Sequence, residues 1–468
     1  MKLYIVFEEE DRMSLVREFF LIPLFILIFI LILASSLISF SAIDKEKVKY
    51  RSQLLEELRE AEAAFIRDKD DSNLRKNYAK LLFESGEFWK AREILRPLVK
   101  KLSKDIEVQN LEARLSYMMG DFESAEKRYK MLIKITNKNS KEYENALKGL
   151  ALVYFQTHQY EKVKNLPDAE NFKSFMELMR KFPEKPYHLE WENKEKTSIL
   201  PFEIKGMLPT MKVIVNGKEL EFILDTGGNL FYIDKTVAEE CGLKKLVTHR
   251  AKYAYTGGEE VEEFLGVADS VKLGEVTLKN VPFSLAEWKS RGIQSDGVVT
   301  TQALKEFLST IDYAHNRIIL RERCKKGLKK FRESVVGKEI VEIPFVLDAT
   351  HLMFARGCLN GRGGLTFLVD SGLASSMPFV ATDGLIEDMG LELRQIEGTK
   401  YSWFKIGSLG LGELVLEKQT QGLAGVIIEE NPYWRFGFIW DGLISHQFLK
   451  NFSSWTIDFD NMTYVFER

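Results

Sequence analysis

The sequence has few cysteines, few histidines and no excess of positive charge. Its three cysteines, Cys241, Cys324 and Cys358, are too few and too scattered to indicate a disulfide framework. Its six histidines show no paired metal-ligand spacing, so we expect no metal and no other cofactor. A formal net charge of −3 leaves no basic patch for nucleic acid, and no phosphate-cradling glycine loop is present. These absences argue against a disulfide scaffold, a metal-dependent protein and a nucleic-acid-binding protein.

One tripeptide occurs twice, each time directly after a run of three apolar residues. Asp225-Thr226-Gly227 follows residues 222–224, and Asp370-Ser371-Gly372 follows residues 367–369. Average composition predicts roughly 0.2 such tripeptides in a chain of this length, so two copies with matching apolar runs are a strong signal. Two acids held in matched loops behind buried strands can share one proton and activate a water molecule.

The two tripeptides belong to a longer internal repeat. Asp225 and Asp370 are 145 positions apart, and so are Asp296 and Asp441, which begin two Asp-Gly-apolar-apolar elements. Each of these elements begins 71 positions after the motif aspartate of its own copy. The repeated unit is therefore a whole domain of about 130 residues, duplicated in tandem.

The sequence within each unit is typical of β-structure. Residues 211–224 indicate two strands around an Asn-Gly hairpin turn. Residues 271–278 and 409–416 indicate further hairpins, and short helices are expected at 301–308 and 446–451.

At these residues each unit resembles a retropepsin-like aspartic protease domain. Two such units in one chain resemble the two-lobed pepsin arrangement, which carries the same Asp-Thr-Gly and Asp-Ser-Gly pair. The resemblance covers about residues 198–468. It implies duplicated all-β lobes that share one active site, and an aspartic endopeptidase in which Asp225 and Asp370 are the catalytic pair. The implied substrate is a peptide or a protein.

The resemblance also implies a role for each member of the two tripeptides. Close carboxyls do not both ionise readily, so the pair would hold one proton, with one acid activating water and the other donating to the peptide carbonyl oxygen. Thr226 and Ser371 would hydrogen-bond across the pseudo-twofold axis and lock the two loops together. Gly227 and Gly372 would leave room for backbone N–H groups to reach the carboxylates.

Aspartic proteases cover the cleft with a glycine-tipped β-hairpin flap. Tyr253, Tyr255, Gly257 and Gly258 lie about 30 positions after the first motif aspartate, where such a flap belongs. A tyrosine of this segment would close over substrate and exclude water, although a plain hairpin turn is the alternative. The matching region of the second unit, residues 401–404, lacks the glycine pair, so we expect a short flap or none there.

Two positions depart from the family pattern. The apolar-apolar-Gly element of the family ends in Thr300 in the first unit and in Ser445 in the second. Glycine there lets the backbone pack tightly under the catalytic loop, and a Cβ could shift that loop. A catalytically inactive scaffold that binds peptides or partner proteins therefore stays open as an alternative.

Both units keep their acid, so the two lobes are expected to pair within one chain and no homodimer is required. Pairing of each unit with its twin in a second chain is the alternative arrangement.

Residues 19–40 are uncharged and apolar apart from three serines. Twenty-two residues at 1.5 Å rise span about 33 Å, which is enough to cross a bilayer core. We therefore predict a single-pass transmembrane anchor at residues 19–42 after an N-terminal tail at 1–18, with a cleaved signal peptide as the alternative. The Lys/Arg count around the segment favours a cytoplasmic C-terminal side. The common tethering of exported enzymes favours an extracytoplasmic side, so the side stays open.

Helical signals dominate residues 44–167. Gly86 and Gly120 are 34 positions apart, and so are Ala91 and Ala125. A third copy places His158 in the glycine slot, 38 positions after Gly120. This period resembles tetratricopeptide repeats, whose stacked helix pairs leave a concave groove for a protein partner. A helical spacer without a partner is the alternative.

The expected fold class is thus a multi-domain α plus β protein. A transmembrane helix would be followed by helical repeats (44–167), a linker (168–197) and two all-β aspartic protease lobes (198–325 and 338–468). The expected function is a membrane-anchored aspartic endopeptidase whose repeats dock a partner or substrate.

Overall fold

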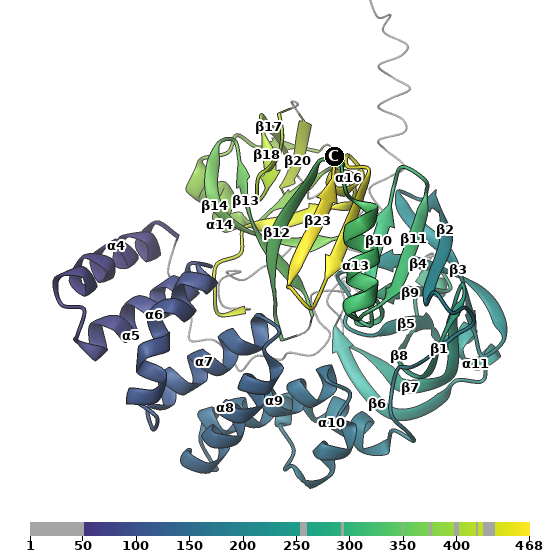
Figure 1. The fold of residues 1–468 in the computed structure, drawn as a ribbon, viewed down its shortest axis with the longest axis horizontal. Helices are drawn as coiled ribbons and strands as arrows, with labels where there is room; N and C mark the ends of the chain where they lie inside the picture. The colour runs from purple at the N-terminus through teal and green to yellow at the C-terminus, as the bar shows by residue number, and fades with distance from the viewer. Residues whose placement is uncertain are drawn as a thin grey trace, which may run out of the picture.

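The computed structural model describes residues 51–252, 260–291, 294–349, 351–373, 377–396, 402–417, 420–424 and 436–468. An arc of helices comes first in the chain, and two β-rich lobes follow it (Figure 1). The fold is therefore a helical repeat region followed by a β-rich region, as the sequence predicts for these residues.

The helical part consists of short helices joined by tight turns. Side chains of Asp71, Asp105, Asp121 and Ser140 accept hydrogen bonds at four helix N-termini, which is the usual preference for an N-cap. The helices are α4 (Arg51–Arg67), α5 (Ser72–Glu84), α6 (Phe88–Lys101), α7 (Ile106–Met118), α8 (Phe122–Ile135), α9 (Lys141–Gln156), η2 (Tyr160–Asn165), η3 (Glu170–Phe172) and α10 (Lys173–Lys181). We refer to residues 51–165 as the repeat segment.

The three glycine-slot residues occupy the same kind of turn. Gly86, Gly120 and His158 all have left-handed backbone conformations, with φ of +85°, +74° and +57°. At each turn the slot residue donates its N–H to the carbonyl three positions earlier, and the next residue donates to the carbonyl five positions earlier. This is the pattern that ends a helix with a left-handed residue. The histidine therefore takes the place of glycine without changing the turn.

The first lobe, called lobe 1, is built from strands and three short helices. Its strands are β1 (His188–Trp191), β2 (Thr197–Lys205), β3 (Leu208–Val215), β4 (Lys218–Asp225), β5 (Phe231–Asp234), β6 (Lys244–Lys252), β7 (Glu260–Leu273), β8 (Val276–Ala286), β9 (Gly297–Thr300), β10 (Phe307–Asp312) and β11 (Arg317–Glu322). Its helices are α11 (Lys235–Glu240), η4 (Lys289–Arg291) and α12 (Thr301–Leu304). Helix α13 (Lys325–Ser334) leads to the second lobe.

The second lobe, called lobe 2, repeats this plan. Its strands are β12 (Ile340–Leu347), β13 (Met353–Leu359), β14 (Arg362–Asp370), β15 (Phe379–Ala381), β16 (Arg394–Gln395), β17 (Ser402–Ile406), β18 (Leu409–Leu411), β19 (Leu414–Leu416), β20 (Thr420–Ala424), β21 (Gly442–Ser445), β22 (Ser454–Asp458) and β23 (Thr463–Glu467). Its helices are α14 (Asp383–Met389) and α16 (His446–Leu449).

The hairpins predicted from the sequence are present. Asn216 and Gly217 both have positive φ, +48° and +85°, and connect β3 to β4 as a two-residue hairpin turn. The pairs β7–β8 and β18–β19 form the other two hairpins. The predicted short helices are shorter than expected, because residues 307 and 308 already belong to β10 and α16 ends at Leu449.

Strand pairing makes the two lobes equivalent. In lobe 1, β4 runs parallel to β9 with Asp225 opposite Thr300; in lobe 2, β14 runs parallel to β21 with Asp370 opposite Ser445. The 145-residue repeat of the sequence is therefore a repeat of sheet register.

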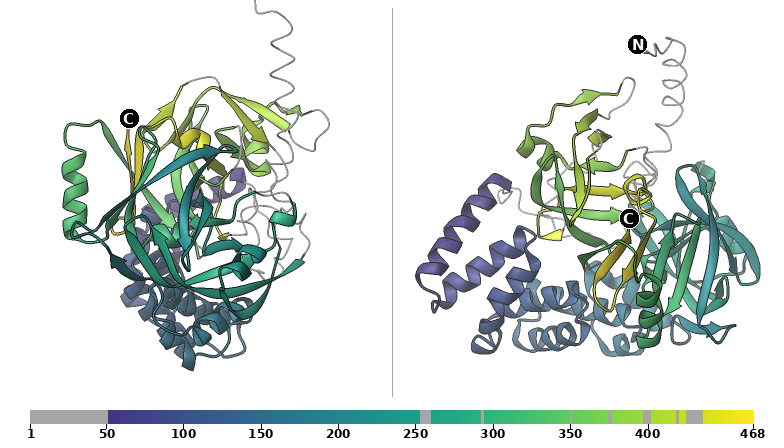
Figure 2. Two further views of the ribbon diagram at one scale, coloured as in Figure 1. Left: turned by 90° about the vertical axis from the view of Figure 1, so that its right-hand side faces the viewer. Right: turned by 45° about the horizontal axis from the view of Figure 1, so that its top comes forward.

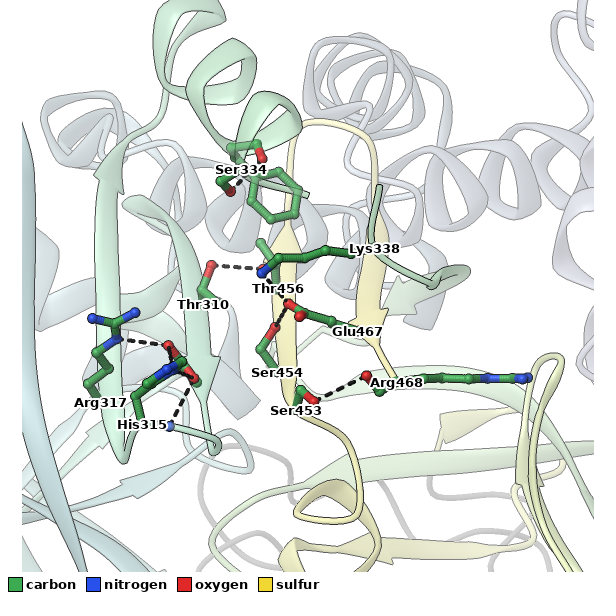
Figure 3. A network of polar contacts seen from close by, with 12 residues as sticks. Thr310, His315, Arg317, Ser334, Lys338, Ser453, Ser454, Thr456, Glu467 and Arg468 are labelled. Atoms are coloured by element: carbon green, nitrogen blue, oxygen red, sulfur yellow. Dashed lines mark hydrogen bonds and ion pairs between the residues drawn. The ribbon is translucent and has the colours of Figure 1, made fainter. Parts of the chain in front are cut away.

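A continuous antiparallel sheet joins the lobes. Its strand order is β2-β11-β10-β22-β23-β12, and the central pair places Thr310 opposite Thr456. The hydroxyls of these two threonines lie 2.7 Å apart across the junction (Figure 3). Lobe 1 and lobe 2 thus pair within one chain.

The helices share hydrophobic cores with both lobes. Phe438 of lobe 2 packs against Phe83 and Phe88, with ring centroids 6.1 and 4.8 Å apart. Leu230 and Leu265 of lobe 1 belong to a core that also contains residues of α7 to α10. Figure 2 shows the row of helices running beneath both lobes. The repeat segment is therefore packed into the protein along most of its length.

The membrane part of the expected fold class is wrong. Among the residues that the structure describes, no helix is long and apolar enough to cross a membrane. The tail and anchor predicted at residues 1–18 and 19–42 lie outside the described residues. The fold class is corrected to a helical repeat region followed by a β-rich region, and the predicted single-pass membrane localisation is withdrawn with the anchor.

Candidate active site

Asp225 and Asp370 end equivalent strands and meet between the lobes. Both side chains are almost fully buried, and they are hydrogen-bonded to one another. The backbone N–H of Gly227 donates to Asp225 Oδ1 at 2.6 Å, and that of Gly372 donates to Asp370 Oδ1 at 2.9 Å. The structure therefore brings together the two acids that the sequence singles out.

Four hydrogen bonds made by the hydroxyls of Thr226 and Ser371 cross from one lobe to the other. Ser371 Oγ accepts from the N–H of Thr226 at 3.1 Å, and Thr226 Oγ1 accepts from the N–H of Ser371 at 3.0 Å. Each hydroxyl then donates to the carbonyl of the other lobe, Thr226 to Val369 at 3.1 Å and Ser371 to Leu224 at 3.3 Å. This reciprocal ring fixes the two loops against each other.

Gly372 allows the loops to approach this closely. A Cβ added at Gly372 would lie 2.1 Å from Asp225 Cγ and 2.4 Å from Asp225 Oδ1. Both distances are far below van der Waals contact, so any side chain here would push the two aspartates apart.

Burial changes the ionisation of both acids. It raises the pKa of Asp225 above its ordinary value. It raises the pKa of Asp370 well above the ordinary value, and the negative charge of Asp225 adds to that effect. Two buried carboxyls in direct contact lose their protons one after the other, so the pair holds a single proton over a range of pH.

The two departures from the family pattern are accommodated locally. Thr300 Oγ1 donates to the carbonyl of Leu230 at 2.7 Å, and Ser445 Oγ donates to the carbonyl of Met377 at 2.6 Å. Each hydroxyl also caps the short helix that follows it. In lobe 1 the extra methyl of Thr300 faces Gly228, where a Cβ would lie only 2.4 Å away. These hydroxyls therefore connect the loops that follow Asp225 and Asp370 to the ends of the neighbouring strands.

Asp296 and Asp441, which the sequence shows only as markers of the repeat, support the strands that carry the acids. Asp296 Oδ2 accepts from the N–H of Glu221 at 2.8 Å, and Asp441 Oδ2 accepts from the N–H of Thr366 at 2.7 Å. Their equal spacing in the sequence was the signal that could have revealed this shared role.

The cations that pair with these two supporting acids differ. Asp296 pairs with Lys289 of its own lobe, in a partly exposed contact. Asp441 pairs with Arg51 from the first turn of α4, and both side chains are buried. The repeat segment thus supplies to lobe 2 the cation that lobe 1 supplies to itself.

The predicted flap residues Tyr253, Tyr255, Gly257 and Gly258 lie outside the described residues. The strands that lead to and from them, β6 and β7, pair up to Lys252 opposite Glu260. In lobe 2, residues 402–406 form β17, which pairs with β16 and β20.

Comparison with known proteins agrees with this geometry. Residues 211–303 match the aspartyl protease family, and residues 53–115 match the tetratricopeptide repeat family. The chain is thus similar to tetratricopeptide repeats over residues 53–115 and to an aspartyl protease domain over residues 211–303. The protease match includes Asp225 and ends before Asp370. No curated protein matches the chain.

Three solved structures illustrate the likeness. A retropepsin-like aspartic protease from Rickettsia conorii is 18% identical, covers 29% of this chain and 94% of its own, and has a TM-score of 0.21. Conglutin gamma, a basic 7S globulin from lupine seeds, is 11% identical, covers 58% and 95%, and has a TM-score of 0.38. Basic 7S globulin from soybean is 10% identical, covers 58% and 96%, and has a TM-score of 0.35.

Proposed function

We propose that this protein is an aspartic-type endopeptidase whose single active site is formed by Asp225 and Asp370. The observation that carries the proposal is the contact between two buried carboxyls at loops that cross-lobe hydrogen bonds hold against each other. Adjacent carboxyls that share a proton can act as acid and base at the same time. Under this proposal Tyr253, Tyr255, Gly257 and Gly258 form the flap.

The proposed chemistry needs only these two acids and a water molecule. The ionised carboxylate takes a proton from the water, whose oxygen attacks the peptide carbonyl carbon. The protonated carboxyl donates to the carbonyl oxygen, which gives a neutral tetrahedral diol. When the diol collapses, one of its hydroxyls gives its proton to the ionised carboxylate, the C–N bond breaks, and the nitrogen leaves with the proton of the other carboxyl, so the pair again holds one proton. Thr226, Ser371 and Gly372 keep the loops in register during these steps.

The proposal assigns the domains as the sequence suggests. Repeats occupy residues 44–167, a linker 168–197, and the two protease lobes 198–325 and 338–468. Tetratricopeptide repeats suggest protein–protein interaction, so we assign protein binding to this part of the chain.

Peptide cleavage by purified protein tests the activity. Asp225→Asn and Asp370→Asn should each abolish cleavage, because either change removes a titratable member of the pair. Asp269→Asn is the control, since Asp269 is exposed on β7 and pairs with Lys244. Cleavage that survives in Asp370→Asn would refute a shared pair. A wild-type protein that binds peptides without cleaving them would support the scaffold alternative.

The two single variants also separate the two arrangements of the site. If the acids pair within one chain, Asp225→Asn and Asp370→Asn are both inactive, alone and as a mixture. If each lobe instead paired with its twin in a second chain, each variant would keep the intact pair of its other lobe and would still cleave. We expect no cleavage, because β10 of lobe 1 already pairs with β22 of lobe 2.

A further inference from the structure

The turns of the repeat segment face the lobes. A Cβ added at Gly86 would lie 2.4 Å from Thr366 Oγ1 of β14, and one added at Gly120 would lie 2.9 Å from Met462 Sδ, between β22 and β23. Glycine is therefore favoured at these two turns for two reasons: it adopts the left-handed backbone readily, and it leaves room for the close contact with lobe 2.

The third turn, at His158, lies against lobe 1. Its side chains form a network of buried polar contacts there, which we call the polar junction. His158 Nε2 lies 2.8 Å from Glu306 Oε1. Lys305 Nζ donates to the carbonyl of Gln156 at 2.7 Å and to its side-chain oxygen at 3.0 Å. The amide of Gln156 also contacts His351 Nδ1 in the loop before β13. Helix α9, lobe 1 and lobe 2 therefore meet in one network.

The junction is connected to the catalytic loop of lobe 1 by a very short path. Lys305 directly follows α12, whose first residue is Thr301. Thr301 Oγ1 donates to the carbonyl of Thr226 at 2.6 Å. Four positions thus separate the residue held by the repeat segment from the residue that holds the loop beside Asp225.

Among the described residues of lobe 2, no equivalent connection to the repeat segment is present at this point. Lys450 is the counterpart of Lys305 in the 145-residue repeat, and it is exposed at the end of α16. Lys305 is only 6% exposed. The two lysines occupy equivalent places in the two lobes and differ in their contact with the repeat segment.

The inner side of the repeats also contacts the lobes. Arg114 donates to the carbonyl of Phe436 at 2.8 Å, and Tyr117 donates to the carbonyl of Ala349 at 3.3 Å. The charge of Lys148 interacts with that of Asp348. Much of the surface that a separate partner would use is therefore filled by this chain.

We propose that the protein partner held by the repeat segment is the pair of lobes of the same chain, and that Gln156 and Lys305 are positioning residues for the catalytic loop of lobe 1. The inference about positioning rests on the proposed function; the inference about the partner does not. The segment acts as a brace that holds lobe 1 and lobe 2 together along its row of turns.

Hydrogen exchange of the full chain tests the brace. Lys305→Ala removes both hydrogen bonds to Gln156 and leaves Glu306 buried with one cation fewer. We expect amides 226–232 to exchange about tenfold faster or more, because the variant leaves the buried oxygens of Gln156 without both of these hydrogen bonds. Lys450→Ala is the matched control and should leave these amides unchanged. Equal exchange in the two variants would overturn the proposal.

Kinetics separate positioning from general support. If Lys305 positions the loop, Lys305→Ala lowers kcat with little change in KM, and Lys305→Arg recovers part of the loss. A rise in KM without a fall in kcat would refute the positioning role.

Two further measurements distinguish a failure of this proposal from a failure to fold and from a failure of the proposed function. If Lys305→Ala does not fold, Gln156→Ala removes the side-chain hydrogen bond to Lys305 from the repeat side, keeps the one to the backbone carbonyl, and is judged by the same amides. If the wild-type protein cleaves no peptide, the proposed function fails, and the exchange comparison still decides whether the segment braces the lobes.

Discussion

Arg51 offers a direct measure of how much the repeat segment stabilises lobe 2. Its side chain is 5% exposed and that of its partner Asp441 is 2% exposed, whereas the equivalent pair in lobe 1, Lys289 and Asp296, is 38% and 21% exposed. Removing one partner of a buried ion pair costs about 3–5 kcal/mol. Removing one partner of an exposed pair costs about 0–1 kcal/mol. Arg51→Met should therefore lower the free energy of unfolding far more than Lys289→Met.

The loss should depend on pH. Burial raises the pKa of Asp441, and the Arg51 guanidinium opposes that effect. Without Arg51 the pKa of Asp441 in the folded state rises further. A carboxyl whose pKa is raised on folding destabilises the folded state as pH rises above its ordinary value of 3.8. The loss in free energy of unfolding caused by Arg51→Met should accordingly be larger at pH 7 than near pH 4.

Urea unfolding of the full chain, followed by tryptophan fluorescence, measures these differences. Trp440 and Trp455 are buried in lobe 2 and report on its unfolding. The double variant Arg51→Met/Asp441→Asn should regain most of the loss, because it removes the uncompensated charge. Equal losses in Arg51→Met and Lys289→Met, or no recovery in the double variant, would refute the reasoning.

Three further outcomes follow from the site. Thr226→Val and Ser371→Ala each remove two of four cross-lobe hydrogen bonds and should each cost about 2 kcal/mol in urea unfolding. If the losses in the double variant simply add, the ring is not a unit. Gly372→Ala should abolish cleavage and cost about 1–3 kcal/mol through overpacking. Gly363→Ala should change neither cleavage nor the free energy of unfolding, since a Cβ there meets open space. Equal effects of the two substitutions would contradict the close contact between Gly372 and Asp225. Asp370→Asn should stabilise the protein at pH 7, because the raised pKa makes ionisation unfavourable in the folded state. This gain in free energy of unfolding should vanish as pH falls toward 3.8. A gain that does not change with pH would contradict this explanation.

The duplicated lobes could be predicted from the sequence because the repeat is carried by local patterns. Apolar runs before Asp225 and Asp370 become the inner strands β4 and β14, and the elements at Asp296 and Asp441 become the strands that pair with them. Equal spacing in sequence gives equal register when both copies fold alike. The glycine slots of the repeats were visible for the same reason, since a left-handed turn restricts the residue type.

The contacts between the parts could not be predicted. Arg51 and Asp441 are 390 positions apart and belong to elements with different periodicities, so no spacing rule connects them. Thr300 and Ser445 looked like possible obstacles, because their acceptors are backbone carbonyls that no sequence pattern reveals. The predicted membrane anchor rested on an apolar run alone, and the structure gives it no support among the described residues.

The aromatic packing of Phe438 against Phe83 and Phe88 has a consequence for how such chains evolve. Genes that join independent modules tolerate recombination at the linker, because neither half relies on the other for its core. Here the helices and lobe 2 complete one core, so substitutions on the two sides must be inherited together. A hybrid that joins these helices to the lobes of a distant relative would inherit mismatched halves, and selection should keep this pair of segments together.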